Sequence, residues 1–575
     1  MSSDLVVYNQ SIEEKPVSSV MTDKKWLNVI DQNNGSYQSG QSTLETTSLS
    51  TSDRFMNYRE AYLAIPVLLS VGNTLDDANG MDNLNNRTKT IGLKNSYTSL
   101  IHSMSVDLNG TNIIQSTPFS EFYNAFNLIT CLSFDDIKTQ GSTIGFYPDD
   151  AFSATSFIAN NLAGGAGATV NNQDLLTPGA ETSGVVGRIG NKGFNERLKY
   201  INYNADAEVN GENTIEHPQS AFLTATNVNT LYKNSVFNIS TSAGGSPLIQ
   251  TQVMAVVKLR HLHNFFNNVP LSKGLQFRFI INFNQSTITQ AVPSETTGAE
   301  TIVKSQFGGV NPIMLASHKA GNGGAGLTNN AASSLRADLS IGRTCLDTTL
   351  AGRSTATQSG LPQSVSLYVP SYVMNSSLEA SYVSANSSKR ISYTDIYQFK
   401  IANQSGGATP STFNQLITSG IRGVRSVVVM PMFPAVSNGG GVPEFQSSQS
   451  CCGGGTTALL AQITDFQVQV GGVNQIQTNG RYEFEIFNNY VYGANSVNGG
   501  LTDGLSSGLI GQADWGRKYL YYYVDCNRGT DLERDTPKSI QIQGRNLSAK
   551  TVDYYVFVEF ENNFSIDVGT GAIQP

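Results

Sequence analysis

Two stretches decide the fold: residues 101–115, IHSMSVDLNGTNIIQ, and residues 463–477, ITDFQVQVGGVNQIQ. At a shift of 362 residues, identical residues fall on Ile101, Val106, Gly110, Asn112, Ile114 and Gln115, and just beyond them Phe122 falls on Phe484. In both stretches apolar and polar residues alternate, and a Gly follows, which is typical of a half-buried strand that enters a hairpin turn. The sequence therefore predicts two copies of one β unit.

A second pair of segments supports the duplication. Residues 61–67, AYLAIPV, precede the first hairpin by about as much as residues 427–432, VVVMPM, precede the second. Each half also contains an aromatic-rich candidate for its last strand, at residues 277–284 and 554–563. The first half carries about twice as much chain between its hairpin and this strand, which predicts long surface loops there.

Period-2 alternation is the dominant pattern elsewhere, because successive side chains of a strand point to opposite faces. It predicts strands at Leu275–Phe283, Val365–Val369, Phe466–Val470 and Tyr482–Ile486. Helical periodicity is scarce and predicts only two short helices, at Phe119–Ile129 and Val257–Asn268. The fold class is all-β, with a few short helices and many loops.

Composition narrows the functional classes. A chain of 575 residues is too long for one core. Only 14% of its residues are charged, the net charge is −8 and the pI is 5.3, which argues against a surface that coats nucleic acid. The five cysteines are odd in number and form no C-x-x-C motif, so we expect no disulfide framework. We also expect no secretory signal, because the acidic first twenty residues have no apolar core.

Two motifs suggest catalysis or nucleotide binding, but each lacks its context. Gly504–Gly508 matches the G-x-S-x-G elbow around Ser506, yet no strand pattern precedes it and the last histidine, His318, comes earlier in the chain. Gly321–Gly326 matches G-x-G-x-x-G, but a poor helix pattern follows it. No G-x-x-x-x-G-K-[ST] motif occurs, which excludes a P-loop ATPase. Both matches are interpreted as loops.

Candidate metal and acid/base groups are interpreted in the same way. His261 and His263 have no cluster of Cys or carboxylates beside them, so packing or surface polarity is favoured over metal binding. Asp76–Asn83 is rich in oxygen donors but departs from the calcium-loop spacing. The pairs Asp135–Asp136 and Asp149–Asp150 are expected to be loop or helix-cap residues. We predict no catalytic, cofactor or metal site, and no enzyme.

Four segments resemble double jelly-roll major capsid proteins of polinton-like viruses and virophages. They are Ile101–Ile129, Lys258–Phe279, Ile391–Lys400 and Phe413–Arg422, in the order of the family. The resemblance implies two tandem eight-stranded antiparallel jelly rolls and a homotrimeric, pseudo-hexameric capsomer that tiles an icosahedral shell. It further implies neighbouring capsomers, penton proteins and minor capsid proteins as partners, no sequence-specific nucleic-acid binding, and a location in the virion rather than secretion.

The predicted division has four parts: an N-terminal arm and first strand at 1–50, a first jelly roll at 51–290, a Gly/Ala/Ser/Thr-rich linker at 291–360, and a second jelly roll at 361–575. Loops between Gly141 and Ser246 are expected to form an outer protrusion. Two alternatives stay open: a carbohydrate- or receptor-binding β-sandwich spike or adhesin, supported by aromatic, Asn-rich loops, and a β-sandwich hydrolase, which has no workable catalytic set.

Overall fold

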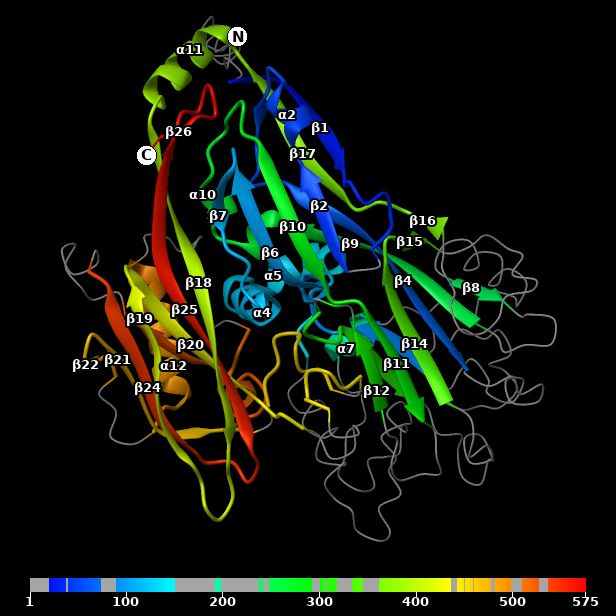
Figure 1. Ribbon diagram of the computed structural model, residues 1–575, viewed down its shortest axis with the longest axis vertical. Helices are drawn as coiled ribbons and strands as arrows, with labels where there is room; N and C mark the ends of the chain where they lie inside the picture. The colour runs from blue at the N-terminus through cyan, green and yellow to red at the C-terminus, as the bar shows by residue number, and fades with distance from the viewer. Residues whose placement is uncertain are drawn as a thin grey trace, which may run out of the picture.

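A computed structural model describes most of the chain. The described residues are 20–37, 40–73, 89–149, 192–197, 237–240, 248–291, 300–304, 306, 308–317, 334–344, 361–435, 442–448, 450–458, 460–476, 481–497, 509–526 and 536–574. Two sheet-built bodies lie side by side, the first drawn in blue to green and the second in yellow to red (Figure 1).

The C-terminal body is an antiparallel sandwich. Its strands are β18 (Lys389–Gln404), β19 (Thr412–Ile421), β20 (Val424–Met432), β21 (Ile463–Val470), β22 (Val473–Asn474), β23 (Tyr522–Asp525), β24 (Lys538–Asn546) and β25 (Val552–Ile566). One sheet has the order β18-β25-β20-β23 and the other β19-β24-β21-β22. Numbered along the chain, the strands run 1-8-3-6 and 2-7-4-5, which is the jelly-roll order.

The N-terminal body repeats this order. Its strands are β1 (Met21–Ile30), β2 (Gln41–Glu45), β4 (Tyr62–Asn73), β6 (Ile101–Leu108), β7 (Thr111–Ile114), β9 (Leu248–Lys258), β10 (Phe277–Phe283), β14 (Ser334–Ile341) and β17 (Ser366–Met374). One sheet has the order β2-β10-β6-β7. In the other, β9 pairs with one edge of β4, while β17 and β14 pair with successive parts of its other edge and β1 pairs with β17.

β14 and β17 are therefore two segments of one interrupted eighth strand. β17 pairs with Tyr62–Ala64 of β4, and β14 pairs with Val67–Asn73. With this strand counted once, the first body also has eight strands. The prediction of two tandem eight-stranded antiparallel jelly rolls is confirmed.

The remaining elements extend or connect the sandwiches. The further strands are β3 (Phe55–Met56), β5 (Lys89–Leu93), β8 (Phe237–Ser240), β11 (Ser286–Ala291), β12 (Glu300–Lys304), β13 (Ile313–Ser317), β15 (Arg343–Thr344), β16 (Leu361–Pro362) and β26 (Ile573–Gln574). The helices are α2 (Thr47–Ser50), η2 (Tyr97–Leu100), α4 (Ser120–Cys131), α5 (Phe134–Ile144), α7 (Lys192–Arg197), α9 (Leu259–Leu262), α10 (Phe265–Asn268), α11 (Ser376–Ala385), α12 (Phe484–Val497) and α13 (Gln512–Trp515).

The duplicated hairpins occupy corresponding places. β6-β7 and β21-β22 each end the order of a four-stranded sheet. Their shared glycines, Gly110 and Gly472, have φ of +83° and +81°, a left-handed conformation that favours glycine in tight turns. The 362-residue shift therefore describes a true structural repeat.

The predicted domain boundaries need correction. Strands β1 and β2 lie within 1–50 but belong to the first jelly roll, as does β17 from the segment predicted to open the second. The predicted linker at 291–360 holds β12, β13, β15 and also β14, the first segment of the eighth strand, and so lies inside the first sandwich. The Gly/Ala/Ser/Thr-rich composition of residues 291–360 is typical of a linker between domains, but the segment is a long connection within one domain. The connection between the jelly rolls is α11.

Three local predictions were wrong. Tyr482–Ile486 forms no strand, since α12 begins at Phe484; Phe484, Phe487 and Val491 follow helical spacing, which five residues of alternation concealed. Val257–Asn268 is the end of β9 followed by two single-turn helices. The strand that corresponds to β10 is β24 rather than β25, because both pair with the hairpin strand of their sheet.

The two sandwiches have separate cores that meet. The second core includes first-body residues such as Phe122 and Phe126, and the first includes second-body residues such as Tyr393 and Ile566. β18 and β25 are long enough to reach the first body, where Phe564 stacks on Phe265 at 5.6 Å between ring centroids. Because each body contributes apolar side chains to the core of the other, the two jelly rolls form one packed unit.

Candidate functional site

Several sequence candidates lie outside the described residues. They are Ser506 and its flanking glycines, Gly321–Gly326, Asp76–Asn83, Asp150, and the loop glycines around 164. The interpretation of these segments as loops stays a prediction, and so does the placement of residues 141–246 on an outer protrusion.

The two histidines are not positioned as a ligand pair. His263 lies 3.3 Å from Asp395 through Nε2, and its Nδ1 accepts a hydrogen bond from the backbone of Phe265. Burial, together with the charges of Arg260 and Lys258, lowers the pKa of His261 to about 3. His263 thus joins α9 to β18 of the second body, while His261 is held neutral.

The aspartates are structural. Ser133 and Asp136 form a reciprocal capping box at the start of α5, and hydrogen bonds from the Ser133 backbone and hydroxyl lower the pKa of Asp136. Asp149 is buried and pairs with Arg197 at 2.7 Å. These places agree with the expectation of caps and loops.

The most densely built region is the seam where α4 of the first jelly roll lies on the sheet β18-β25-β20-β23 of the second. Phe122 packs edge-on against Tyr555 at 5.2 Å between ring centroids. Phe126 meets Tyr521 at 4.9 Å and Tyr523 at 5.9 Å. Such aromatic pairs add about 0.5–1.5 kcal/mol each beyond the area they bury. The helix is therefore an anchor between the two bodies.

One carboxylate is buried in this seam. Tyr123 of α4 donates to Glu559 of β25 at 2.5 Å, and Ser426 of β20 donates to the other carboxylate oxygen. Glu559 is nearly buried, so the two donors compensate for the loss of water around its charge. Burial and the charge of Glu559 raise the pKa of Tyr123 well above its usual value, which keeps the hydroxyl a donor.

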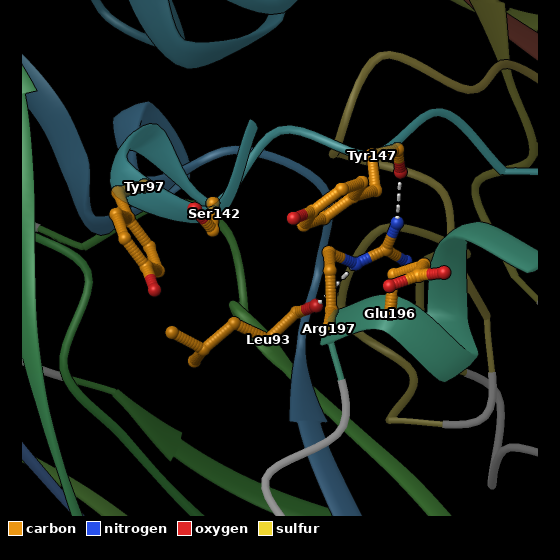
Figure 2. A pocket seen from close by; sticks show the side chains of 7 residues that line it. Leu93, Tyr97, Ser142, Tyr147, Glu196 and Arg197 are labelled. Atoms are coloured by element: carbon orange, nitrogen blue, oxygen red, sulfur yellow. Dashed lines mark hydrogen bonds between the residues drawn. The ribbon is translucent and has the colours of Figure 1, made fainter. Parts of the chain in front are cut away.

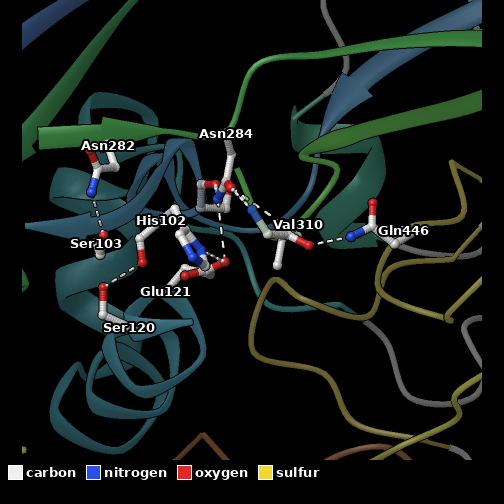
Figure 3. A network of polar contacts seen from close by, with 10 residues as sticks. His102, Ser103, Ser120, Glu121, Asn282, Asn284, Val310 and Gln446 are labelled. Carbon is white, nitrogen blue, oxygen red and sulfur yellow. Dashed lines mark hydrogen bonds and ion pairs between the residues drawn. The ribbon is translucent and has the colours of Figure 1, made fainter. Parts of the chain in front are cut away.

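A polar network closes one end of the seam (Figure 3). Asn284 lies at its centre: its side-chain oxygen accepts from the backbones of Gly309 and Val310 at 2.8 and 3.2 Å, and its nitrogen donates to Glu121 at 3.3 Å. His102 approaches the same Glu121 oxygen at 3.3 Å. From the second body, Gln446 donates to the carbonyl of Gly309. The first-body excursion after β10 is therefore tied to a loop of the second jelly roll.

That loop, described at residues 442–448 and 450–458, contributes Glu444 to a buried ion pair with Lys518. Lys518 Nζ lies 3.2 Å from Glu444 Oε1 and 3.1 Å from Cys452 Sγ, and the side chains of Lys518 and Glu444 are fully buried. Burial alone would lower the pKa of Lys518, but Cys452 and Glu444 outweigh it and leave the pKa raised. Nearby, Lys94 of the first body donates to the carbonyl of Phe445 at 2.6 Å. The polar contacts thus fix the loop in one position.

A cavity of about 50 Å³ lies beside β5 and the end of α5 (Figure 2). Its lining includes Tyr97, Tyr147 and Arg197. The Arg197 guanidinium donates to the carbonyls of Leu93 and Tyr147 and to Asp149, so its charge is already paired. At about 10–15 Å³ of such space per water, the cavity has room for a few waters rather than for a substrate.

Among the described residues, no group of three or more His, Cys, Asp or Glu side chains is placed to hold a metal ion. In the same part of the chain, no helix has both the length and the apolar character needed to cross a membrane. What the described geometry offers is a rigid pair of sandwiches joined by an aromatic seam. The seam was missed from the sequence; its one signal was the run of Phe and Tyr in the predicted helix at 119–129.

The strand order decides the fold class. The chain has the double jelly-roll fold.

Comparison with known proteins found solved structures of similar fold. No protein-family model and no curated protein matches the chain. The mavirus major capsid protein aligns at 10% identity over 98% of this chain and 93% of its own, with a TM-score of 0.42. A chain of the Sputnik virophage aligns at 11% identity over 97% and 89%, with a TM-score of 0.41. The Faustovirus major capsid protein aligns at 9% identity over 96% and 92%, with a TM-score of 0.42.

Proposed function

We propose that this protein is the major capsid protein of a virus, and that it forms trimeric capsomers which tile an icosahedral shell. The observation that carries the proposal is the duplication: two jelly rolls of the same strand order, locked side by side by the α4 seam. A subunit built from two similar bodies presents similar surfaces twice. Three such subunits give a ring of six similar bodies, a shape suited to tiling.

The chemistry of the chain supports a structural role. With 14% charged residues and a net charge of −8, the surface is poor in the cations that coating a genome needs. The described polar clusters tie parts of the fold together, as the Lys518–Glu444 pair and the Asn284 network illustrate. Neighbouring capsomers, penton proteins and minor capsid proteins are the proposed partners, and the virion is the proposed location.

Native mass spectrometry of the purified chain, with protein analysis of purified virus particles, tests this function. We expect a species of three times 61.8 kDa and a chain that dominates the protein content of the particles. A receptor-binding spike would instead be a minor component of the particles, and an adhesin would be absent from them. Either result would overturn the capsid proposal.

A further inference from the structure

The two jelly rolls are equivalent in strand order but not in how their sheets are covered. In the second body, the outer face of β18-β25-β20-β23 is covered by α4 of the first body, through Phe122, Tyr123 and Phe126. The corresponding sheet of the first body, made by β1, β17, β4 and β9, carries the exposed Trp26 and three half-buried tyrosines on this face, and α5 covers it only at β9, where Gln140 accepts from Lys258. The repeat therefore contains one position that a helix fills and one that stays open over β1, β17 and the start of β4.

The open position is an aromatic patch, defined here as Trp26, Tyr62, Tyr368 and Tyr372. Tyr62 stacks on Tyr368 at 5.1 Å between ring centroids, and Trp26 lies 5.5 Å from Tyr62. Trp26 is 48% exposed. Lys24 extends over the rings of Trp26 and Tyr372, at 5.5 and 5.2 Å from their centroids. A tryptophan so exposed among stacked tyrosines has the composition of an interface core.

The repeat also identifies the element that corresponds to α4. Phe122 of α4 falls on Phe484 at the 362-residue shift, and α12 follows the second hairpin as α4 follows the first. Phe487 and Val491 of α12 are buried in its own jelly roll. The positions that match Phe119 and Tyr123 are Arg481 and Glu485, and both are exposed.

The patch and α12 lie on opposite sides of the molecule, with β1 and β17 at the upper right and α12 at the lower left (Figure 1). A chain therefore cannot place its own α12 on its own patch. Two different surfaces that meet between identical copies make a head-to-tail contact, which closes into a ring when the rotation allows.

We propose that the aromatic patch of one copy binds α12 of a second copy of this chain, repeating between chains the contact that α4 makes within one. This assignment rests on the proposed function, since it supplies the contact between the three copies. Each ring then alternates first and second jelly rolls, and every outer face of this kind is covered by a helix.

Charge supports the same occupant. At the rim of the patch Lys24 pairs with Glu60 at 3.1 Å, and Lys25 and Arg54 both lie beside Asp23, so the rim keeps an excess of positive charge. Glu485 is exposed in the first turn of α12, and Glu483 and Arg481 are exposed just before the helix begins. Acidic groups near the lysines and a guanidinium over tyrosine rings are both favourable arrangements. The α4 seam within a chain is mostly aromatic. The proposed contact between chains is more polar, because its two surfaces are exposed to water before assembly.

The first test substitutes the centre of the patch. Trp26→Asp should raise the concentration at which the trimer half-dissociates by at least about tenfold, because buried aromatic anchors dominate interface energies. Leu416→Asp is the matched control: Leu416 is 56% exposed on β19, outside the patch, and its substitution should leave the trimer unchanged. Circular dichroism of both variants verifies folding. A Trp26→Asp variant as trimeric as the control would overturn the assignment.

Cross-linking identifies the occupant. In a Cys131→Ser, Cys345→Ser background, a chain with Asn28→Cys and Glu485→Cys should be joined by a short bis-maleimide into covalent dimers and trimers, with no larger species. Each single variant should stay uncoupled. Dimers of the Asn28→Cys variant alone would mean that patches meet each other, and this result would refute the assignment.

The two proposals fail in different ways. A wild-type protein that is monomeric by native mass spectrometry rejects the capsomer, and the patch assignment with it. A wild-type trimer that tolerates Trp26→Asp and gives no cross-links between Asn28→Cys and Glu485→Cys keeps the capsomer and rejects only this contact.

Discussion

Replacement of Phe126 by alanine is the sharpest perturbation of the seam between the two jelly rolls. Phe126 of α4 is fully buried and packs against the rings of Tyr521 and Tyr523. A phenylalanine buries roughly 150–250 Å². At about 25 cal/mol per Å² this corresponds to roughly 4–6 kcal/mol, and measured Phe→Ala losses in cores run about 3–5 kcal/mol. We expect Phe126→Ala to lower the free energy of unfolding by about 4 kcal/mol.

Denaturant unfolding at fixed protein concentration measures this loss, and hydrogen exchange locates it. The matched control is Phe266→Ala, a fully buried phenylalanine of the first core that stacks on Phe279 at 5.9 Å. Both variants should lose similar stability, but only Phe126→Ala should speed exchange in α4 and β23 together. A loss below about 1 kcal/mol, or faster exchange confined to the first core, would refute the idea that α4 holds the two bodies together.

Three further outcomes are expected. The depressed pKa of His261, about 3 against 6.5 in the unfolded chain, contributes stability that is present above pH 6.5 and is lost as pH falls toward 3. The wild-type protein should therefore lose about 1–2 kcal/mol of unfolding free energy between pH 7 and pH 5, relative to His261→Asn. Urea unfolding in which the difference between the two proteins is the same at both pH values would count against this prediction. Lys518→Met should cost about 3–5 kcal/mol by leaving Glu444 charged and unpaired, and adding Glu444→Leu should recover most of it in a thermal melt; a double variant no better than the single would contradict the pairing. Gly342→Ala should lower the free energy of unfolding by about 3 kcal/mol or more, because the φ of Gly342 is +74° and a Cβ would lie 2.0 Å from the Tyr37 ring. An unchanged melting temperature would show that the break in the eighth strand tolerates a side chain.

Much of the fold followed from local patterns. The repeat at Ile101 and Ile463 identified the two hairpins because strand alternation and a turn glycine are both short-range features. The same reasoning misplaced the domain boundary, since the eighth strand of the first sandwich is assembled from β14 and β17 with a long excursion between them. Nothing local in residues 291–360 tells an excursion inside a domain from a linker between domains.

The seam was beyond local reasoning for a different reason. The periodicity predicted a helix over 119–129, and its aromatic residues were visible, but which sheet they cover depends on how the two bodies dock. The polar groups at the loop 442–458 are similar: Lys518 and Glu444 are 74 residues apart, and only the tertiary fold brings them together. The alternation at Tyr482–Ile486 misled because five residues fit a strand and one helical turn equally well.

Electron cryomicroscopy of the purified protein is the most direct test of the central claim, that duplicated jelly rolls build a shell-forming ring. The account predicts closed rings of three chains with a near six-fold outline, in which α12 of each chain lies on the patch around Trp26 of the next. Single chains, or two-fold dimers with no ring, would contradict it.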